Sequence, residues 1–296
     1  MPEHYIGRFA PSPTGPLHFG SLVCALGSYL DAVAHEGHWW VRMEDLDPPR
    51  EMPGAAARIL KSLDAHGLHG HGPVVWQSQR HGLYQSALDQ LRQRGLVYPC
   101  TCTREQVRKA GGHRRDDCLG VRSLGERGTK EPQESYALRF ACAGVTEKFS
   151  DIWQGEQTQP IGEDPILKRK DGLYAYQLAV VVDDIQQNVN CVVRGADLLD
   201  CTGVQRQLFL ALGAEPPRFG HMPLVMNEGG QKLSKQNHAA PLDDATPSEN
   251  LFQALRFLSF LPPAELVNEP PRQILSWASA RWQRQQVDRR NRLLEQ

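Results

Sequence analysis

The 296-residue sequence lacks long apolar runs and any marked excess of one charge. No stretch approaches the roughly 20 apolar residues that a membrane-spanning helix needs, and the first residues lack the basic start and apolar core of a secretion signal. The 33 lysines and arginines nearly balance 34 aspartates and glutamates, so bulk charge does not indicate a nucleic-acid partner. We therefore expect a cytoplasmic monomer with no membrane partner.

The cysteines and glycines exclude two further classes of protein. The 7 cysteines are an odd number and are scattered, unlike the disulfide framework of a small secreted domain. No Gly-x-Gly-x-x-Gly fingerprint is present, so binding of a dinucleotide such as NAD is not indicated. Basic residues gather at 104–115, 168–170 and 281–292, but such patches are more typical of solvated surface than of an RNA site.

Strand-like and helical segments alternate in the first part of the chain. We expect strands at 5–10, 38–44 and 74–77, and helices at 22–33, 55–66 and 83–94. This alternation predicts βαβ units on a parallel sheet, whose ligands bind at the carboxyl ends of the strands. Arg8 and Glu44 lie at two such strand ends, so we expect them around one crevice.

The alternation breaks between residues 97 and 161, where short β-like runs at 136–141 and 147–152 indicate an insertion. Beyond it, we expect strands at 191–194 and 223–226, and helices at 204–212, 248–260 and 274–282.

The loop between the first expected strand and helix, residues 8–21, reads RFAPSPTGPLHFGS. Its prolines leave the backbone little freedom. His18 and Gly20 fall where the helix begins, and the unpaired N–H groups and dipole of a helix N-terminus suit a phosphate. Gly20 has no Cβ, which lets a nucleotide approach the backbone. The His-Phe-Gly match alone is too short to exclude an ordinary helix start.

A second motif, Lys232-Leu233-Ser234-Lys235, follows an expected turn at 227–230. Two lysines and a serine suit a triphosphate, although such a loop alone is usually a solvated turn. In this order and separation, the two segments resemble the HIGH and KMSKS signatures of class I aminoacyl-tRNA synthetases. Residues 8–21, 42–50, 194–199 and 232–238 resemble the glutamyl group of that family, and the resemblance runs from about residue 6 to residue 241.

This resemblance implies an α/β fold: a Rossmann-type HIGH/KMSKS nucleotide-binding catalytic domain with an inserted small α+β subdomain that carries a zinc site. The catalytic domain is expected at 1–97 and 164–245, the insertion at 98–163 and a short helical segment at 246–296. The chain stops where longer members continue into an anticodon-binding domain. We therefore expect that domain to be absent, as in a short branch of the group.

The same resemblance implies the chemistry. Members of the short branch use ATP and Mg²⁺ to activate L-glutamate as glutamyl-adenylate without requiring tRNA. They transfer the glutamyl group to the queuosine base at the wobble position, in the anticodon loop of tRNA(Asp). Residue chemistry does not separate this acceptor from a tRNA 3′ end, so a compact glutamyl-tRNA synthetase and a small-molecule adenylating ligase stay open. A non-catalytic binding module is disfavoured because His18, Lys232 and Lys235 are all present.

The expected catalytic residues are His18 and Lys235, which can stabilise the charge that builds on the phosphoryl oxygens. The resemblance assigns ATP to His18, Gly20, Ser21, Lys232, Ser234 and Lys235. It assigns glutamate to Arg8, Phe9, Ala10, Pro11, Ser12, Glu44, Tyr176 and Arg194. An arginine fork suits the carboxylates of glutamate and Glu44 suits its ammonium, although Arg and Glu at strand ends also form structural ion pairs.

Cys100, Cys102 and Cys118 indicate a structural zinc site that lacks a fourth ligand. The family pattern has a tyrosine four residues before the last cysteine, where this chain has Arg114, which cannot ligate a metal. His113, Asp116 or Asp117 could substitute, and His113 is the best of them by ligand chemistry. Three reduced, partly buried cysteines without a metal are an equal alternative.

Overall fold

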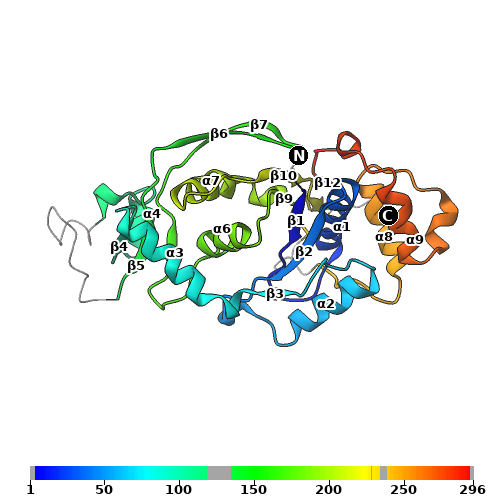
Figure 1. Ribbon diagram of the computed structural model, residues 1–296, viewed down its shortest axis with the longest axis horizontal. Coiled ribbons are helices and arrows are strands. Elements are labelled where there is room, and N and C mark those ends of the chain that lie inside the picture. The colour runs from blue at the N-terminus through cyan, green and yellow to red at the C-terminus, as the bar shows by residue number, and fades with distance from the viewer. Residues whose placement is uncertain (1–3, 119–134, 228, 234–238, 294–296) are drawn as a thin grey trace.

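The computed structural model describes residues 4–118, 135–227, 229–233 and 239–293. Two groups of parallel strands lie at its centre (Figure 1). The first contains β1 (Ile6–Phe9), β2 (His38–Met43) and β3 (Val75–Trp76), and the second contains β9 (Cys191–Gly195) and β10 (Arg218–Met222). Asn190 joins them: its backbone N–H donates to the Ile6 carbonyl at 3.0 Å and its Oδ1 accepts from the Ile6 N–H at 2.9 Å. The predicted α/β fold with parallel strands is confirmed.

Helices cover both faces of these strands (Figure 1). α1 (Phe19–Ala34), α2 (Ala55–Ala65), α8 (Pro247–Phe257) and α9 (Pro271–Ser279) enclose one core, and α3 (His81–Gln93), α6 (Tyr176–Gln186) and α7 (Thr202–Ala211) enclose the other. Successive strand residues point to opposite faces, so Cys191 and Val193 of β9 enter the first core and Val192 enters the second. The strands are therefore buried on both sides, as is usual for parallel sheets.

The insertion builds a separate antiparallel sheet from β4 (Val97–Cys100), β5 (Ala137–Phe140) and β8 (Ile166–Lys168), beside the short helix α4 (Arg104–Lys109). β8 pairs with β5 although it lies beyond residue 163, where the sequence predicts that the insertion ends. A hairpin of β6 (Thr146–Asp151) and β7 (Gly155–Pro160) then runs back over α7 toward β10 (Figure 1).

Short elements complete the described chain. The 3₁₀ helices are η1 (Pro48–Arg50), η2 (Gln77–Gln79), η3 (Arg115–Asp117), η4 (Ala196–Cys201), η6 (Ala264–Asn268) and η7 (Arg284–Gln286), and the parallel pair β11 (Val225–Met226) and β12 (Arg292–Leu293) lies near the C-terminus. Two expected helices end early: α8 stops at Phe257 because Ser259 has a φ of 69°, and α9 stops at Ser279. None of the helices in the described ranges is long and apolar enough to cross a bilayer.

Candidate active site

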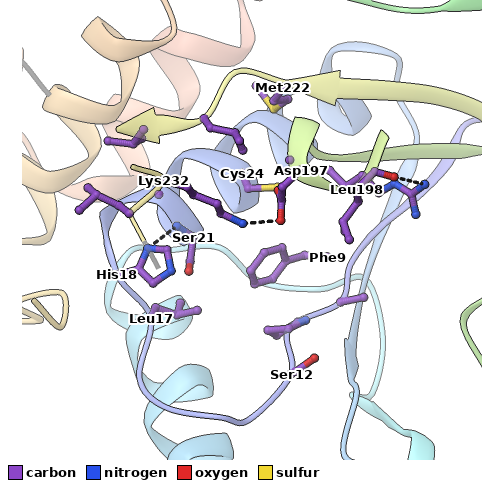
Figure 2. Close-up of a pocket in the computed structure, with 18 of the residues that line it drawn as sticks. Phe9, Ser12, Leu17, His18, Ser21, Cys24, Asp197, Leu198, Met222 and Lys232 are labelled. Carbon is purple, nitrogen blue, oxygen red and sulfur yellow. Dashed lines mark hydrogen bonds and ion pairs between the residues drawn. The ribbon is translucent and has the colours of Figure 1, made fainter. Parts of the chain in front are cut away.

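A cavity of about 420 Å³ opens at the carboxyl ends of β1, β2 and β9 (Figure 2). Every described residue that the sequence assigns to glutamate or ATP lines it: Arg8, Phe9, Ala10, Pro11, Ser12, His18, Gly20, Ser21, Glu44, Tyr176, Arg194 and Lys232. Ser234 and Lys235 lie outside the described residues. The predicted crevice around Arg8 and Glu44 is therefore present, and the residues expected for glutamate and those expected for ATP line the same cavity.

The N-terminus of α1 forms one wall of this cavity. His18 is the N-cap residue, and its Nδ1 accepts the Ser21 N–H at 3.2 Å. The imidazole proton therefore lies on Nε2, which can donate to a ligand oxygen. A Cβ on Gly20 would lie 3.3 Å from the His18 ring, so glycine keeps this wall open. The result is a set of donors suited to a phosphate.

Lys232 lies beside the N-terminus of α1 in the cavity lining, and its side chain points toward Asp197 (Figure 2). It follows the predicted turn, in which Gly230 N–H donates to the Asn227 carbonyl at 2.9 Å, and Lys232 bridges back to Met226. Its ammonium forms an ion pair with Asp197, which also lines the cavity. The sequence prediction gave no role to Asp197. In the structure, Asp197 holds Lys232 at the cavity, where an anionic ligand can take the place of Asp197 as its partner.

Two arginines and a carboxylate of α6 form a buried network beneath the cavity. Asp184 accepts from Arg8 Nε at 3.2 Å and pairs with Arg42 at 2.8 Å. Burial alone would raise the pKa of Asp184, but Arg42 and Arg8 hold it below its ordinary value. Asp184 therefore stays ionised and fixes the Nε edge of Arg8, so the guanidinium is oriented before any ligand arrives.

The pKa of Glu44 is shifted in the opposite direction from that of Asp184. Burial raises its pKa to about 7, although Arg42 and Arg8 oppose the shift. The nearest Arg42 nitrogen is 3.8 Å from Glu44 Oε1, and this buried oxygen accepts no hydrogen bond from the described residues. A ligand ammonium would supply the missing donor and stabilise the ionised carboxylate.

Arg194 and Tyr176 lie next to each other in the cavity lining. Tyr176 begins α6, and its hydroxyl is 3.5 Å from Arg194 Nη1. Arg194 is buried and is also held by Gln205, Thr202 and His221, at 2.7, 2.9 and 2.9 Å. Its position is thus set by several elements, and sequence reasoning identified the arginine but none of these three partners.

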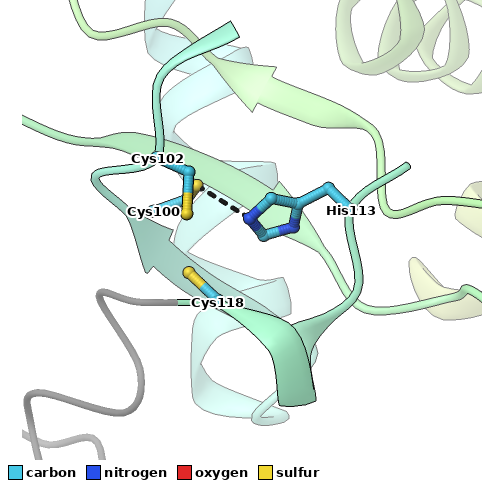
Figure 3. Close-up of side chains that lie close together, drawn as sticks. All are labelled: Cys100, Cys102, His113 and Cys118. Atoms are coloured by element: carbon cyan, nitrogen blue, oxygen red, sulfur yellow. Dashed lines mark hydrogen bonds between the residues drawn. The ribbon is translucent and has the colours of Figure 1, made fainter. Parts of the chain in front are cut away.

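The predicted cysteine cluster is also assembled (Figure 3). Ligand atoms of Cys100, Cys102, His113 and Cys118 all lie within 4.8 Å of one another. Three sulfurs and one imidazole are a donor set typical of structural zinc, and the hydrogen bond from the Cys118 thiol lowers the pKa of Cys100, which favours the metal-binding thiolate. His113 is thus the member of the predicted fourth-ligand set that joins the cysteines, and Asp116 and Asp117 do not.

The neighbours of His113 fix its tautomer. The Tyr98 hydroxyl donates its only proton to Asp164 at 2.9 Å, so it must accept from His113 Nδ1, 3.0 Å away. The lone pair of His113 therefore lies on Nε2, which is 3.1 Å from the Cys100 sulfur. This is the arrangement that a metal-binding histidine needs. Tyr98 and Asp164 were not identified from the sequence, because each comes from a different strand or loop.

Residues 6–265 match the family described as tRNA synthetases class I (E and Q), catalytic domain. A Vibrio cholerae protein named Glutamyl-Q tRNA(Asp) synthetase is 47% identical over 289 residues, which are 97% of this chain and 93% of that protein. A Salmonella typhi protein of the same name is also 47% identical, over 95% of this chain and 92% of its own length.

Solved structures agree on the fold. A glutamate tRNA ligase from Elizabethkingia meningosepticum, in complex with its amino acid, superposes with a TM-score of 0.79 at 24% identity, covering 99% of this chain and 67% of that one. Glutamate-tRNA synthetase from Elizabethkingia anophelis gives a TM-score of 0.81 at 23% identity, over 99% of this chain and 68% of that one. The chain belongs to the class I tRNA synthetases of the E and Q type, and within them to the group of relatives named Glutamyl-Q tRNA(Asp) synthetase.

Proposed function

We propose that the chain is an ATP-dependent ligase that activates L-glutamate as glutamyl-adenylate without requiring tRNA. It then transfers the glutamyl group to the queuosine base at the wobble position of tRNA(Asp). The activation step is supported by the cavity that contains the N-terminus of α1, two arginines and Glu44. The acceptor is supported by the name that the 47% identical relatives share.

In the first step, a glutamate carboxylate oxygen attacks the α-phosphorus of ATP, the bond between the α- and β-phosphates breaks, and pyrophosphate leaves. Mg²⁺ is expected to accompany the ATP. The N–H groups at the start of α1 and the Nε2 proton of His18 can stabilise charge on the phosphoryl oxygens. Lys232, once it leaves Asp197, and Lys235 supply positive charge to the departing pyrophosphate.

The glutamate subsite is defined by charge. Arg8 and Arg194 are fixed by buried partners and can each bind a carboxylate of the substrate. Glu44 lines the same cavity and has an unused buried oxygen for the substrate ammonium. An acid that lacks the second carboxylate would leave one arginine of the pair without its partner, which disfavours its binding.

In the second step, an acceptor hydroxyl attacks the carbonyl carbon of the glutamyl-adenylate. The bond between that carbon and the phosphate oxygen breaks, and AMP leaves. An adjoining cavity of about 590 Å³ shares Ser12, Glu44 and Tyr176 with the first. It offers room for an acceptor nucleoside beside the adenylate. The observation that carries the whole proposal is that phosphate donors and a complement to a dicarboxylic amino acid line one cavity.

The first test is ATP–pyrophosphate exchange with glutamate, with and without tRNA. We expect exchange in the absence of tRNA, and a loss of about a hundredfold or more in K235A, since a donor to the developing charge is removed. The exposed Lys61 on α2 gives the matched control, K61A, which should exchange normally. Normal exchange by K235A would remove this lysine from the mechanism, and an absolute need for tRNA would contradict tRNA-independent activation.

The second test identifies the acceptor. The enzyme is incubated with labelled glutamate, ATP and purified tRNA(Asp), with or without queuosine. We expect label only on tRNA that carries the modified base. Label on the 3′ end would indicate a compact glutamyl-tRNA synthetase, and adenylation of a different acid with no transfer to RNA would indicate a small-molecule ligase.

A further inference from the structure

Arg194 donates a hydrogen bond to the His221 ring, and this bond determines which ring nitrogen of His221 carries the proton. The Arg194 Nε–H donates to His221 Nε2 at 2.9 Å, and the ring of His221 is fully buried. Because an arginine nitrogen only donates, His221 Nε2 must present its lone pair. The proton of the neutral imidazole then lies on Nδ1, which faces Asp151 Oδ2 at 2.5 Å. The three side chains therefore form a directed chain of hydrogen bonds, from Arg194 to His221 to Asp151.

The protonation states agree with this direction. Burial lowers the pKa of His221, which keeps its imidazole neutral. Burial alone would raise the pKa of Asp151, but hydrogen bonding with His221 holds it below its ordinary value, which keeps the carboxylate ionised. Asp151 Oδ1 also accepts the backbone N–H groups of Trp153 and Gln154, at 3.0 and 2.9 Å. Its orientation is thus fixed by its own turn.

The chain connects the inserted hairpin with the substrate cavity. Asp151 ends β6, and the next residue pairs with β10 through Ile152 N–H to the Phe219 carbonyl at 2.9 Å. Gly220 of β10 permits this approach, because a Cβ there would lie 2.5 Å from the Trp153 ring. Arg194 lines the cavity on the other side of His221, and Asp151 and His221 do not.

We propose that Asp151 and His221 are positioning residues: Asp151 holds His221 in the tautomer that accepts from Arg194, and this orients the Arg194 guanidinium for a carboxylate of the amino-acid substrate. The inference rests on the proposed function for the identity of that substrate. With Nε directed at His221, Nη1 is the nitrogen nearest to the Tyr176 hydroxyl, another residue of the cavity lining. Gln205 and Thr202 still accept from the Nη nitrogens when His221 or Asp151 is changed, so the guanidinium is tilted within the cavity rather than released.

The decisive variant is D151N. An asparagine can still accept the backbone N–H groups, but its amide can donate to His221 Nδ1 and drive the imidazole proton to Nε2, where it opposes Arg194 Nε–H. We expect a KM for glutamate that is raised about tenfold or more, with an unchanged KM for ATP. Heteronuclear NMR of the His221 side chain should show the proton on Nδ1 in the wild type and on Nε2 in D151N.

The matched control is E147Q, on the same strand and the same buried face as Asp151. Glu147 accepts from Arg206 and Gln207 of α7 and does not line the cavity. This variant should leave both KM values unchanged. Should D151N not fold, H221Q and H221L replace it: glutamine keeps an acceptor oxygen for Arg194 and should preserve most of the glutamate affinity, whereas leucine should lose it.

The proposal is overturned by a wild-type His221 protonated on Nε2, by a normal KM for glutamate in D151N, or by equal behaviour of H221Q and H221L. A rise in the KM for ATP as large as that for glutamate would indicate a merely structural role and also overturn it. A wild-type enzyme that does not activate glutamate would instead refute the proposed function, and the tautomer measured by NMR would still decide the hydrogen-bond chain.

Discussion

At the scale of single residues, two of the carboxyl groups that face Arg42, those of Asp184 and Glu44, have opposite pKa shifts. Asp184 lies 2.8 Å from Arg42 and 3.2 Å from Arg8, and these contacts outweigh its burial. Glu44 lies 3.8 Å from Arg42, where the attraction no longer compensates for burial. The network therefore supplies one permanent anion that orients Arg8 and one carboxyl that ionises fully only when a cation binds beside it.

This difference predicts how glutamate binding depends on pH. The pKa of Glu44 is about 7 without ligand, and an ammonium beside it stabilises the ionised form. Below that pH the Glu44 carboxyl of the ligand-free protein is protonated. The affinity for glutamate should therefore fall by up to about tenfold for each unit by which the pH decreases. Calorimetric titration of glutamate between about pH 5 and about pH 8 measures this dependence.

The matched variant for this prediction is E44Q, which keeps the size of the side chain and removes its titration. We expect weak glutamate binding with little pH dependence over the same range. If E44Q and the wild type showed the same pH profile, another group would be responsible and Glu44 would not bind the ammonium.

The residue scale also shows what could be predicted from sequence. Residues 8–21 could be assigned together because one short loop and one helix start carry them. His221 and Asp151 could not, because they are 70 positions apart and each is one polar residue in a short strand that contains others. Neither segment has a periodicity or motif that indicates their contact, which is created only when the β6 hairpin packs on β10.

At the scale of elements, one strand of the β9–β10 pair was predicted from the sequence and the other was not. β9, which reads CVVRG, was expected almost to its exact bounds. β10 reads RFGHM, and its Gly220 and His221 weaken the β signal because they serve contacts with Trp153 and Arg194. The strand between residues 218 and 222 was therefore missed, and only the segment after it was expected.

The insertion is the element whose stability should depend on a metal. Cys100 and Cys102 lie at the end of β4 and just beyond it, and Cys118 and His113 lie on the following loop, so a zinc ion would join the two segments. We expect the purified protein to bind one zinc ion through these four residues. Loss of the metal should lower the unfolding temperature and increase proteolysis within residues 98–163. Metal analysis by mass spectrometry, followed by chelation, measures both effects.

Two variants distinguish the role of His113 as fourth ligand from the role of Tyr98, which orients His113. H113A should lose zinc, and Y98F should bind it roughly tenfold to a hundredfold more weakly, because Tyr98 fixes the His113 tautomer. C201S is the control, since Cys201 lies outside the cluster and should not change the zinc content. Full zinc occupancy in H113A would show that another residue completes the site, and absence of zinc from the wild type would support three reduced cysteines.

At the scale of the whole molecule, the C-terminal segment forms hydrogen bonds with segments that are distant from it in the sequence. Arg284 Nε and Trp282 Nε1 donate to Asp31 of α1 at 2.7 and 3.0 Å, and Trp153 Nε1 of the insertion donates to the Arg284 carbonyl at 3.0 Å. β12 pairs with β11, which leads to the Lys232 turn. By sequence, Arg284 belongs to a basic patch typical of solvated surface. In the structure, its side chain instead binds the buried Asp31.

These contacts predict a large effect of R284A on stability. Asp31 is fully buried, and Arg284 helps to hold its pKa below the ordinary value despite burial. Removal of the arginine leaves that charge uncompensated, which should lower the free energy of unfolding by about 3 kcal/mol at neutral pH. Urea denaturation measures the change, and R281A, at an exposed arginine three positions earlier, should have little effect.

The pH dependence gives the sign of this interaction. A carboxyl with a lowered pKa stabilises the fold above its unfolded pKa, and that contribution is lost as the pH falls through the folded value. The wild type should therefore lose the benefit of the Asp31–Arg284 pair in acid, and the difference from R284A should narrow there. Adding D31N to R284A removes the unpaired charge, so the double variant should be more stable than R284A. If D31N instead added a second full loss, the two residues would act independently, and the segment would be held by packing of Trp282 rather than by this pair.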